Sequence, residues 1–128
     1  MHAEDIGKLI LRLTLGGLLL FHGIDKLLHG IGFIKTLVAA HHLPPALAYG
    51  VYVGEVIAPL MVITGWYCRI GAALIVINML TAFLMVHTQD LLALGEHGGW
   101  RLELQGFYLF TGLAILFLGP GQLRLQRG

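Results

Sequence analysis

Glu55 is the residue of this 128-residue chain that most needs a chemical explanation. It lies between Gly54 and Val56 near the middle of a long apolar stretch, where its short side chain cannot easily reach water. A charge at the centre of a membrane helix costs about 2.5 to 3.5 kcal/mol on insertion scales, so it requires a cation, a donor network or a proton. Glu55 is therefore a candidate for an intramembrane ion pair or for proton exchange.

Candidate partners for Glu55 gather on one face of the first apolar stretch. At about 100° per residue, four polar side chains fall within an arc of about 100° on a helix there: His22, Asp25, Lys26 and His29. Helices that run in alternating directions bring His87, after the third apolar stretch, and Glu103, before the fourth, to the same side of the membrane. His22 and Lys26 can donate hydrogen bonds, whereas Glu55 and Glu103 can exchange protons.

Two interpretations of these polar residues remain open. In the first, Lys26 and Glu55 form a structural ion pair, while His22 and His87 satisfy buried hydrogen bonds. In the second, the residues line a pocket open to the outer leaflet, which binds the polar head of a lipophilic molecule such as a quinone. The second interpretation predicts a ligand-binding set of His22, Lys26, Glu55, His87 and Glu103. Of these, Glu55, His22 and Lys26 are the predicted catalytic residues.

A metal site is not predicted, although the chain contains seven histidines. His22, Asp25 and His29 share a helix face, but their spacing matches no metal-binding motif. The single cysteine, Cys68, excludes an intrachain disulfide and a self-contained dithiol pair. A net charge of +1 gives no basic surface of the kind that binds nucleic acid.

The elements that must position these residues are membrane helices. Hydrophobic residues make up 57% of the chain and charged residues only 12%, against about a quarter charged in an ordinary soluble domain. Four apolar stretches of about 20 residues fill a single domain over residues 1–128. We predict an all-α integral membrane four-helix bundle surrounded by the lipid bilayer, with spans at approximately 6–28, 45–64, 68–88 and 101–119.

The connections and charges predict the topology of this bundle. Residues 30–43 are too short and polar to span but repeat apolar residues at helical spacing, which predicts a short interfacial helix between helices one and two. Four spans put both termini on one side of the membrane. That side holds five cations, whereas the opposite side holds three. The five are Lys8, Arg12, Arg69, Arg124 and Arg127. By the positive-inside rule both termini are cytoplasmic, with Arg12 and Arg69 interpreted as anchors there.

Other polar residues of the apolar stretches are interpreted as packing groups. Asn78 with Thr81, and Gln105 with Tyr108 and Thr111, are expected to form hydrogen bonds between helices rather than to act in catalysis. Gly54 and Ala58 belong to a stripe of small residues that allows a neighbouring helix to approach closely. These residues are expected to hold the bundle together.

Several motifs, in this order, resemble the DoxX family of small bacterial membrane proteins: LRLTLGGLLLFHGIDKLLHG, LPP, Glu55, TGWYCRIGA, NMLTAFLMVH and a closing GPG. They cover nearly the whole chain. The resemblance implies a compact four-helix bundle that crosses the bacterial cytoplasmic (inner) membrane several times. Positions that the family favours match Arg12, His22, Lys26 and Glu55, whereas WRLEL departs from a pattern in which the acid follows the tryptophan more closely.

The resemblance also implies a function. Members of the family are associated with quinone-linked oxidation, including a thiosulfate-oxidising membrane subunit, and with membrane complexes that handle thiol or oxidative stress. The chain is thus expected to be a membrane subunit of a quinone-linked oxidoreductase system. Because no flavin, haem or iron–sulfur motif is present, we expect no covalently bound cofactor and a separate redox partner protein. The alternative is a non-enzymatic bundle that binds or transports a small lipophilic molecule or anchors a partner enzyme; a homo-oligomer remains open.

Overall fold

The computed structural model describes residues 2–85, 94–95, 98–100 and 102–125. The regular elements of this part are all helices, joined by turns and irregular segments, and it has one isolated bridge between Leu94 and Trp100. Four regular helices form its frame: α1 (Ala3–His29), α2 (Gly32–Ala40), α5 (Cys68–Met85) and α6 (Glu103–Leu118). Between α2 and α5 a continuous helical segment changes its winding three times along its length. Its pieces are the 3₁₀ helix η1 (Pro45–Tyr49), α3 (Gly50–Tyr52), the π-helix η2 (Val53–Ile57) and α4 (Ala58–Thr64).

Three of these helical segments are long and apolar enough to cross a membrane: Ala3–His29, Pro45–Thr64 and Cys68–Met85. The helix α6 is also apolar but has only 16 residues. Large apolar side chains cover the outside of the bundle. Seven of those in the described part of the chain are at least 70% exposed: Phe21, Leu28, Phe33, Leu84, Phe107, Phe117 and Leu125. An apolar surface of this extent fits contact with lipid rather than with water.

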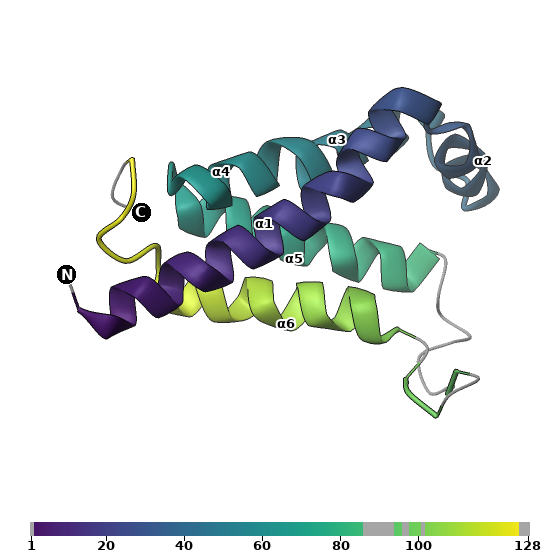
Figure 1. Cartoon of the computed structure of the whole chain (residues 1–128). Coiled ribbons are helices and arrows are strands. Elements are labelled where there is room, and N and C mark those ends of the chain that lie inside the picture. The colour runs from purple at the N-terminus through teal and green to yellow at the C-terminus, as the bar shows by residue number, and fades with distance from the viewer. Residues whose placement is uncertain (1, 86–93, 96–97, 101, 126–128) are drawn as a thin grey trace.

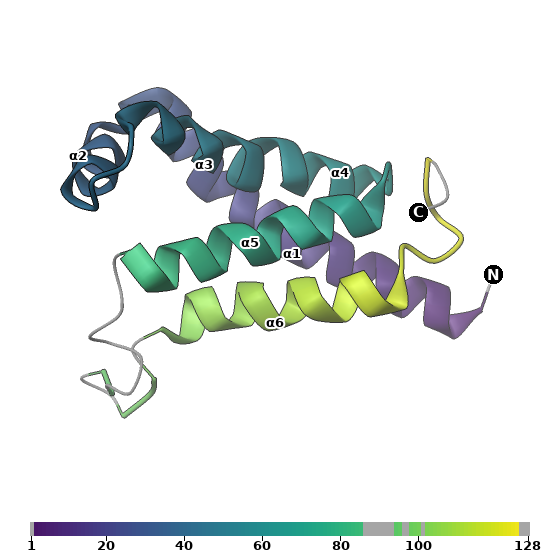
Figure 2. The same ribbon diagram turned by 180° about the vertical axis from the view of Figure 1, so that it is seen from behind.

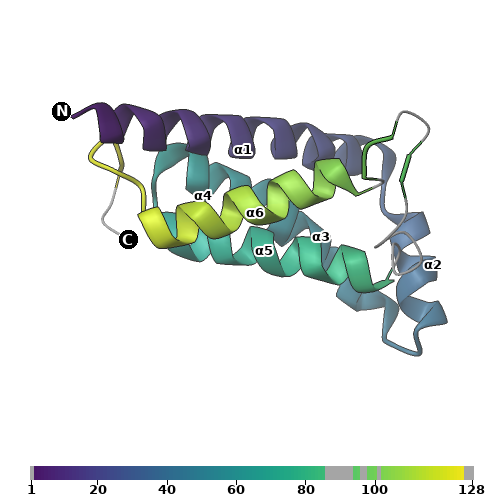
Figure 3. The ribbon, with the colours of Figure 1, turned by 90° about the horizontal axis from the view of Figure 1, so that it is seen from below.

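The helices pack as a closed ring. The first helix, α1, contacts α4 and α6, and α5 contacts the same two helices from the opposite side (Figures 1 and 2). The described segment after α6 lies beside the beginning of α1, so both ends of the chain are at one end of the bundle (Figure 3). The short helix α2 lies at the other end, packed against η1.

Small residues bring the backbones close together in the centre of the ring. Ala58 of α4 and Ala72 of α5 are completely buried, and Gly71 faces the carbonyl oxygen of Ala58. A Cβ at Gly16 would lie 2.9 Å from the carbonyl oxygen of Pro59, so α1 and α4 touch through their backbones. Close contacts between small residues are the usual means by which membrane helices associate.

The helix boundaries lie close to the ranges expected from the sequence. Pro45–Thr64 coincides with the expected second span, and α2 lies within the expected interfacial segment, 30–43. The first helix begins three residues before position 6, because the carboxylate of Asp5 accepts a hydrogen bond from the backbone N–H of His2 and caps it. At the end of α6, Gly119 adopts a φ of 79° and stops the helix one residue before the expected limit. Residues 86–88 and 101 of the expected spans lie outside the described residues.

Candidate functional site

A π-helix carries Glu55. The widened winding of η2 replaces a regular α-helical turn over Val53–Ile57, where Glu55 is the central residue. Its backbone meets α1 so closely that a Cβ at Gly23 would overlap the carbonyl oxygen of Glu55. On the other side, a Cβ at Gly54 would lie 2.5 Å from the side chain of Asn78 in α5. Two glycines thus let η2 wedge between α1 and α5, and π-helical turns of this kind are frequent at functional sites.

The carboxylate of Glu55 joins three helical segments. Its Oε1 lies 2.5 Å from Nζ of Lys26 in α1, which makes a hydrogen-bonded ion pair. Its Oε2 accepts a hydrogen bond of 3.0 Å from Nδ2 of Asn78 in α5. Glu55 is 7% exposed, whereas the Lys26 side chain keeps 24% of its surface exposed. The buried carboxylate is therefore paired, as a charge at this depth must be.

This ion pair also lies in the wall of a large cavity. The cavity has a volume of about 710 Å³ and is lined mainly by apolar side chains from α1, α2, the Pro45–Thr64 segment, α5 and α6. Its polar lining residues are His22, Lys26, Glu55, Asn78, Thr81, Gln105 and Tyr108. Apolar cavities of roughly 300 to 1,000 Å³ with a few convergent polar groups are typical of small-molecule sites. The arrangement thus combines the two alternatives left open by the sequence, an ion pair and a cavity.

Tyr108 and His22 form the α1–α6 side of the cavity. The two rings meet edge to face, with their centroids 5.8 Å apart. Tyr108 is only 7% exposed, and its hydroxyl has no hydrogen-bond partner among the residues that the structure describes. Leaving a buried hydroxyl without a partner is costly. A ligand in the cavity would offer Tyr108 the acceptor that the described residues do not supply.

The helix α2 covers the cavity at the end far from the chain termini. Ile31 and Val38 are buried against Ala48 of η1, in a small apolar cluster separate from the main core. The ammonium group of Lys35 lies 4.6 Å from the ring centroid of Tyr49, which adds a cation–π contact between α2 and η1. The expected interfacial segment therefore forms a wall of the cavity as well as a connection.

The five ligand-binding residues predicted from the sequence fall into three groups. His22, Lys26 and Glu55 line the same cavity. Glu103 is exposed in the first turn of α6 beside Gly99 and does not belong to the lining. His87 lies outside the described residues.

Four polar residues that are interpreted from the sequence as packing groups line the cavity: Asn78, Thr81, Gln105 and Tyr108. Asn78 does form the expected interhelical hydrogen bond, but its acceptor is Glu55 itself. The hydroxyl of Tyr108 has no partner among the described residues, and the hydroxyl of Thr81 donates to the carbonyl oxygen of Ile77 in its own helix instead of to another helix. The sequence signal that could have identified them is a polar side chain within an apolar span, on the helix face that packs against the helices of Glu55 and Lys26. By contrast, His29 and Asp25 pair with each other at 2.9 Å on the exposed side of α1 and leave His22 alone in the cavity wall.

Arg12 lies apart from this cavity and is buried, at 1% exposure, instead of extending to the membrane surface as an anchor. Its Nε and Nη2 donate hydrogen bonds of 2.9 Å to the carbonyl oxygens of Val62 and Ile63. Its Nη1 donates to the carbonyl oxygens of Pro120 and Leu123. The guanidinium thus ties α1 to the end of α4 and to the segment after α6, which is a structural role.

Comparison with known proteins gives one match. The family model described as DoxX matches residues 7–88, a range that contains His22, Lys26, Glu55 and Asn78 and ends before α6. No curated protein and no solved structure matches the chain.

Proposed function

The chain belongs to the DoxX family and is a multi-pass membrane protein, and from this premise we propose that it binds a lipophilic, quinone-like molecule in the cavity beside Glu55. In this proposal it is a membrane subunit of a quinone-linked oxidoreductase system. The observation that carries the proposal is the combination of an apolar cavity of about 710 Å³ with an ion pair in its wall, between the buried Glu55 and the half-buried Lys26.

The position of the cavity suits a ligand that arrives from the bilayer. Several of its lining side chains are largely exposed, as at the mouth of a cavity that opens to the outside of the bundle: Phe33 is 70% exposed, Ile77 59% and Leu47 58%. A ring with a long apolar tail can therefore have its head inside the cavity while the tail stays among these side chains and the lipid. The mainly apolar lining favours such an amphipathic ligand over a polar metabolite.

The polar groups of the cavity fit the head of a quinone. When bound, a quinone supplies two carbonyl oxygens that accept hydrogen bonds and, on reduction, protons. The hydroxyl of Tyr108 and Nζ of Lys26 can donate to such oxygens, and Glu55 can hold or release a proton beside them. Asn78 fixes the carboxylate in place through its 3.0 Å hydrogen bond. The electrons come from a separate redox partner protein.

The proposed topology places the cavity in the outer half of the membrane. In it α6 forms a fourth span and both termini lie in the cytoplasm of a bacterial cell. The position of both chain ends at one end of the bundle supports an even number of spans. The 16 residues of α6 extend about 24 Å at 1.5 Å per residue, so the segments flanking it must complete the crossing.

A quinone-binding measurement with a matched pair of variants tests the proposal. Full-length protein in detergent is titrated with a short-chain ubiquinone and with a short-chain menaquinone, and affinity and thermal stability are recorded. Glu55→Gln keeps the shape of the side chain but removes its charge, and we expect at least about a tenfold loss of affinity, equal to about 1.4 kcal/mol. Glu103→Gln makes the same change outside the cavity and should bind as the unchanged protein does. If the protein without any substitution binds neither quinone, the proposal is refuted.

A second candidate function is the binding or transport of a lipophilic molecule without redox chemistry, or the anchoring of a partner enzyme. One observation favours it: both oxygens of Glu55 already have partners, so the ion pair can be stable without a ligand. Under this alternative, apolar molecules that lack carbonyl groups bind as tightly as quinones. The Glu55→Gln variant would then lose stability without selective loss of quinone binding.

A further inference from the structure

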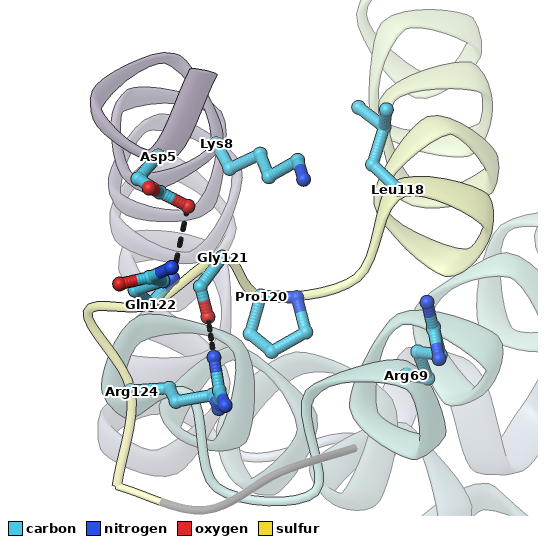
Figure 4. Close-up of a pocket in the computed structure, with 8 residues that line it drawn as sticks. All are labelled: Asp5, Lys8, Arg69, Leu118, Pro120, Gly121, Gln122 and Arg124. Carbon is cyan, nitrogen blue, oxygen red and sulfur yellow. Dashed lines mark hydrogen bonds between the residues drawn. The ribbon is translucent and has the colours of Figure 1, made fainter. Parts of the chain in front are cut away.

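A second hollow lies at the opposite end of the bundle, where both ends of the chain meet. Its volume is about 350 Å³, and three of its lining residues are cations from different parts of the chain: Lys8 of α1, Arg69 of α5 and Arg124 after α6. Figure 4 shows Lys8 extending from α1 toward the end of α6, with Arg69 on the far side of Pro120 and Arg124 below. This hollow shares no lining residue with the cavity beside Glu55.

The positive charges of the residues that line this hollow exceed the negative charges. Lys8 and Arg69 have no hydrogen-bond or ion-pair partner in the described part of the chain. Asp5, the one acidic lining residue, directs its two oxygens to the backbone N–H groups of His2 and Gln122. Three cations against one carboxylate leave an excess of two positive charges in the lining of the hollow.

The frame of the hollow is held in place by buried groups. The guanidinium of Arg12 binds the carbonyl oxygens of Pro120 and Leu123, and Asp5 binds the N–H of Gln122. Gly121, between these anchored residues, has a φ of 77° and accepts a hydrogen bond from Arg124. The turn that forms one wall is therefore fixed before any ligand arrives, which lowers the entropic cost of binding.

We propose that this hollow binds a phosphate-bearing anion, with Lys8 and Arg69 as its main cationic contacts. A dianion or monoanion of this kind matches the excess of positive charge and the fork of donors on Arg69. Leu118, which is 47% exposed, adds an apolar wall at the mouth of the hollow. The hollow is at an end of the bundle, where phospholipid headgroups lie, so the chemistry fits an anionic phospholipid headgroup and also free phosphate.

Lipid binding by purified full-length protein in neutral detergent tests this proposal. Short-chain phosphatidylglycerol, phosphatidylcholine of equal chain length and inorganic phosphate are titrated separately, with binding followed by native mass spectrometry and thermal shift. Each cation near a membrane surface contributes about fivefold in affinity, so the double variant Lys8→Gln/Arg69→Gln should bind phosphatidylglycerol about 25-fold more weakly. Lys35→Gln, at the other end of the bundle, is the matched control and should leave this binding unchanged.

The outcomes separate the two sources of the anion. Tight binding of phosphatidylglycerol that inorganic phosphate does not displace identifies a lipid headgroup, whereas displacement by phosphate shows that the free anion suffices. Equal binding of the two lipids without any effect of phosphate would overturn the proposal, as would a double variant that binds both anions normally. If the double variant does not fold, the single variants Lys8→Gln and Arg69→Gln give the same comparison at about fivefold each. Because the hollow is remote from Glu55, these results are independent of quinone binding.

Discussion

Arg12 and Glu55 are both buried charges within helical segments, at 1% and 7% exposure, yet their surroundings differ in kind. All the hydrogen-bond acceptors of Arg12 are backbone carbonyl oxygens. Glu55 is bound by two side chains, Lys26 and Asn78, and lies in the wall of a cavity. The depth of a charge in the bundle therefore does not reveal its role, whereas the nature of its partners does.

The partners of Arg12 explain why a charge there stabilises the fold. The last carbonyl groups of a helix have no N–H partner within the helix. Val62 and Ile63 are in the last turn of α4, where the left-handed Gly65 ends the helix. Arg12 donates hydrogen bonds to both of these carbonyl oxygens, and its remaining nitrogen, Nη1, donates to the segment after α6. Its five donors suit this task, and no surface remains for a ligand.

The largest effect that this comparison predicts is the loss of stability in Arg12→Met. The variant removes every donor and leaves several buried carbonyl oxygens without partners, each of which costs about 1 to 3 kcal/mol. We expect the free energy of unfolding to fall by at least about 3 kcal/mol, measured by denaturant titration in mixed micelles. Arg69→Met changes an exposed arginine in the same way and should shift stability by less than about 0.5 kcal/mol. If the two variants are equally stable, the structural role of Arg12 is contradicted, and Arg12 contributes no more to the fold than an arginine at the surface does.

An intermediate effect is expected for Gly23→Ala, which should lower both the stability of the fold and the affinity for quinone. The new Cβ would overlap the carbonyl oxygen of Glu55 and push η2 away from α1. Overpacking of this kind costs about 1 to 3 kcal/mol, and the displaced carboxylate should also weaken quinone binding. Gly17→Ala is the matched control in the same helix, because a Cβ there meets nothing within 4 Å. A Gly23→Ala protein with normal stability and normal affinity would contradict the close approach of η2 to α1.

The smallest effect on stability is expected for Tyr108→Phe, which removes only a hydroxyl without a partner in the described part of the chain. Stability should change by less than about 0.5 kcal/mol. Quinone affinity should fall about fivefold to tenfold, the value of one hydrogen bond, in the titration used for Glu55→Gln. Tyr49→Phe changes a tyrosine outside the lining and should bind normally. Unchanged affinity in Tyr108→Phe would exclude its hydroxyl as a donor to the ligand.

The helices could be predicted from the sequence because their boundaries are encoded locally. Pro45 and Gly65 mark the two ends of the second segment, and long apolar runs mark α1 and α5. The π-helical winding of η2 could not be predicted, because it depends on contacts of Gly23 and Gly54 with other helices. Periodicity reports which residues form a helix but not a local change in its pitch.

The site was predictable to the extent that membrane burial makes a residue type unusual. Glu55 and Lys26 were identified because charges inside spans are costly, and the structure brings them together. The role of Arg12 was missed because its acceptors are backbone groups about 50 and more than 100 residues further along the chain. Tyr108 was interpreted as a packing group because a hydroxyl between helices easily finds a hydrogen-bond partner. Only the folded arrangement shows that no described residue is its partner.

The most direct test of the central claim, that the charge at Glu55 serves a ligand, is the location of a bound quinone. A photoreactive azido-quinone is bound to the full-length protein, irradiated and mapped by mass spectrometry of the labelled peptides. Labels on α1 near His22, on the Pro45–Thr64 segment near Glu55 and on α5 near Asn78, all suppressed by excess unlabelled quinone, are the result that we predict. Labels confined to the end of the bundle around Arg12, or spread evenly and unaffected by competitor, would contradict the account.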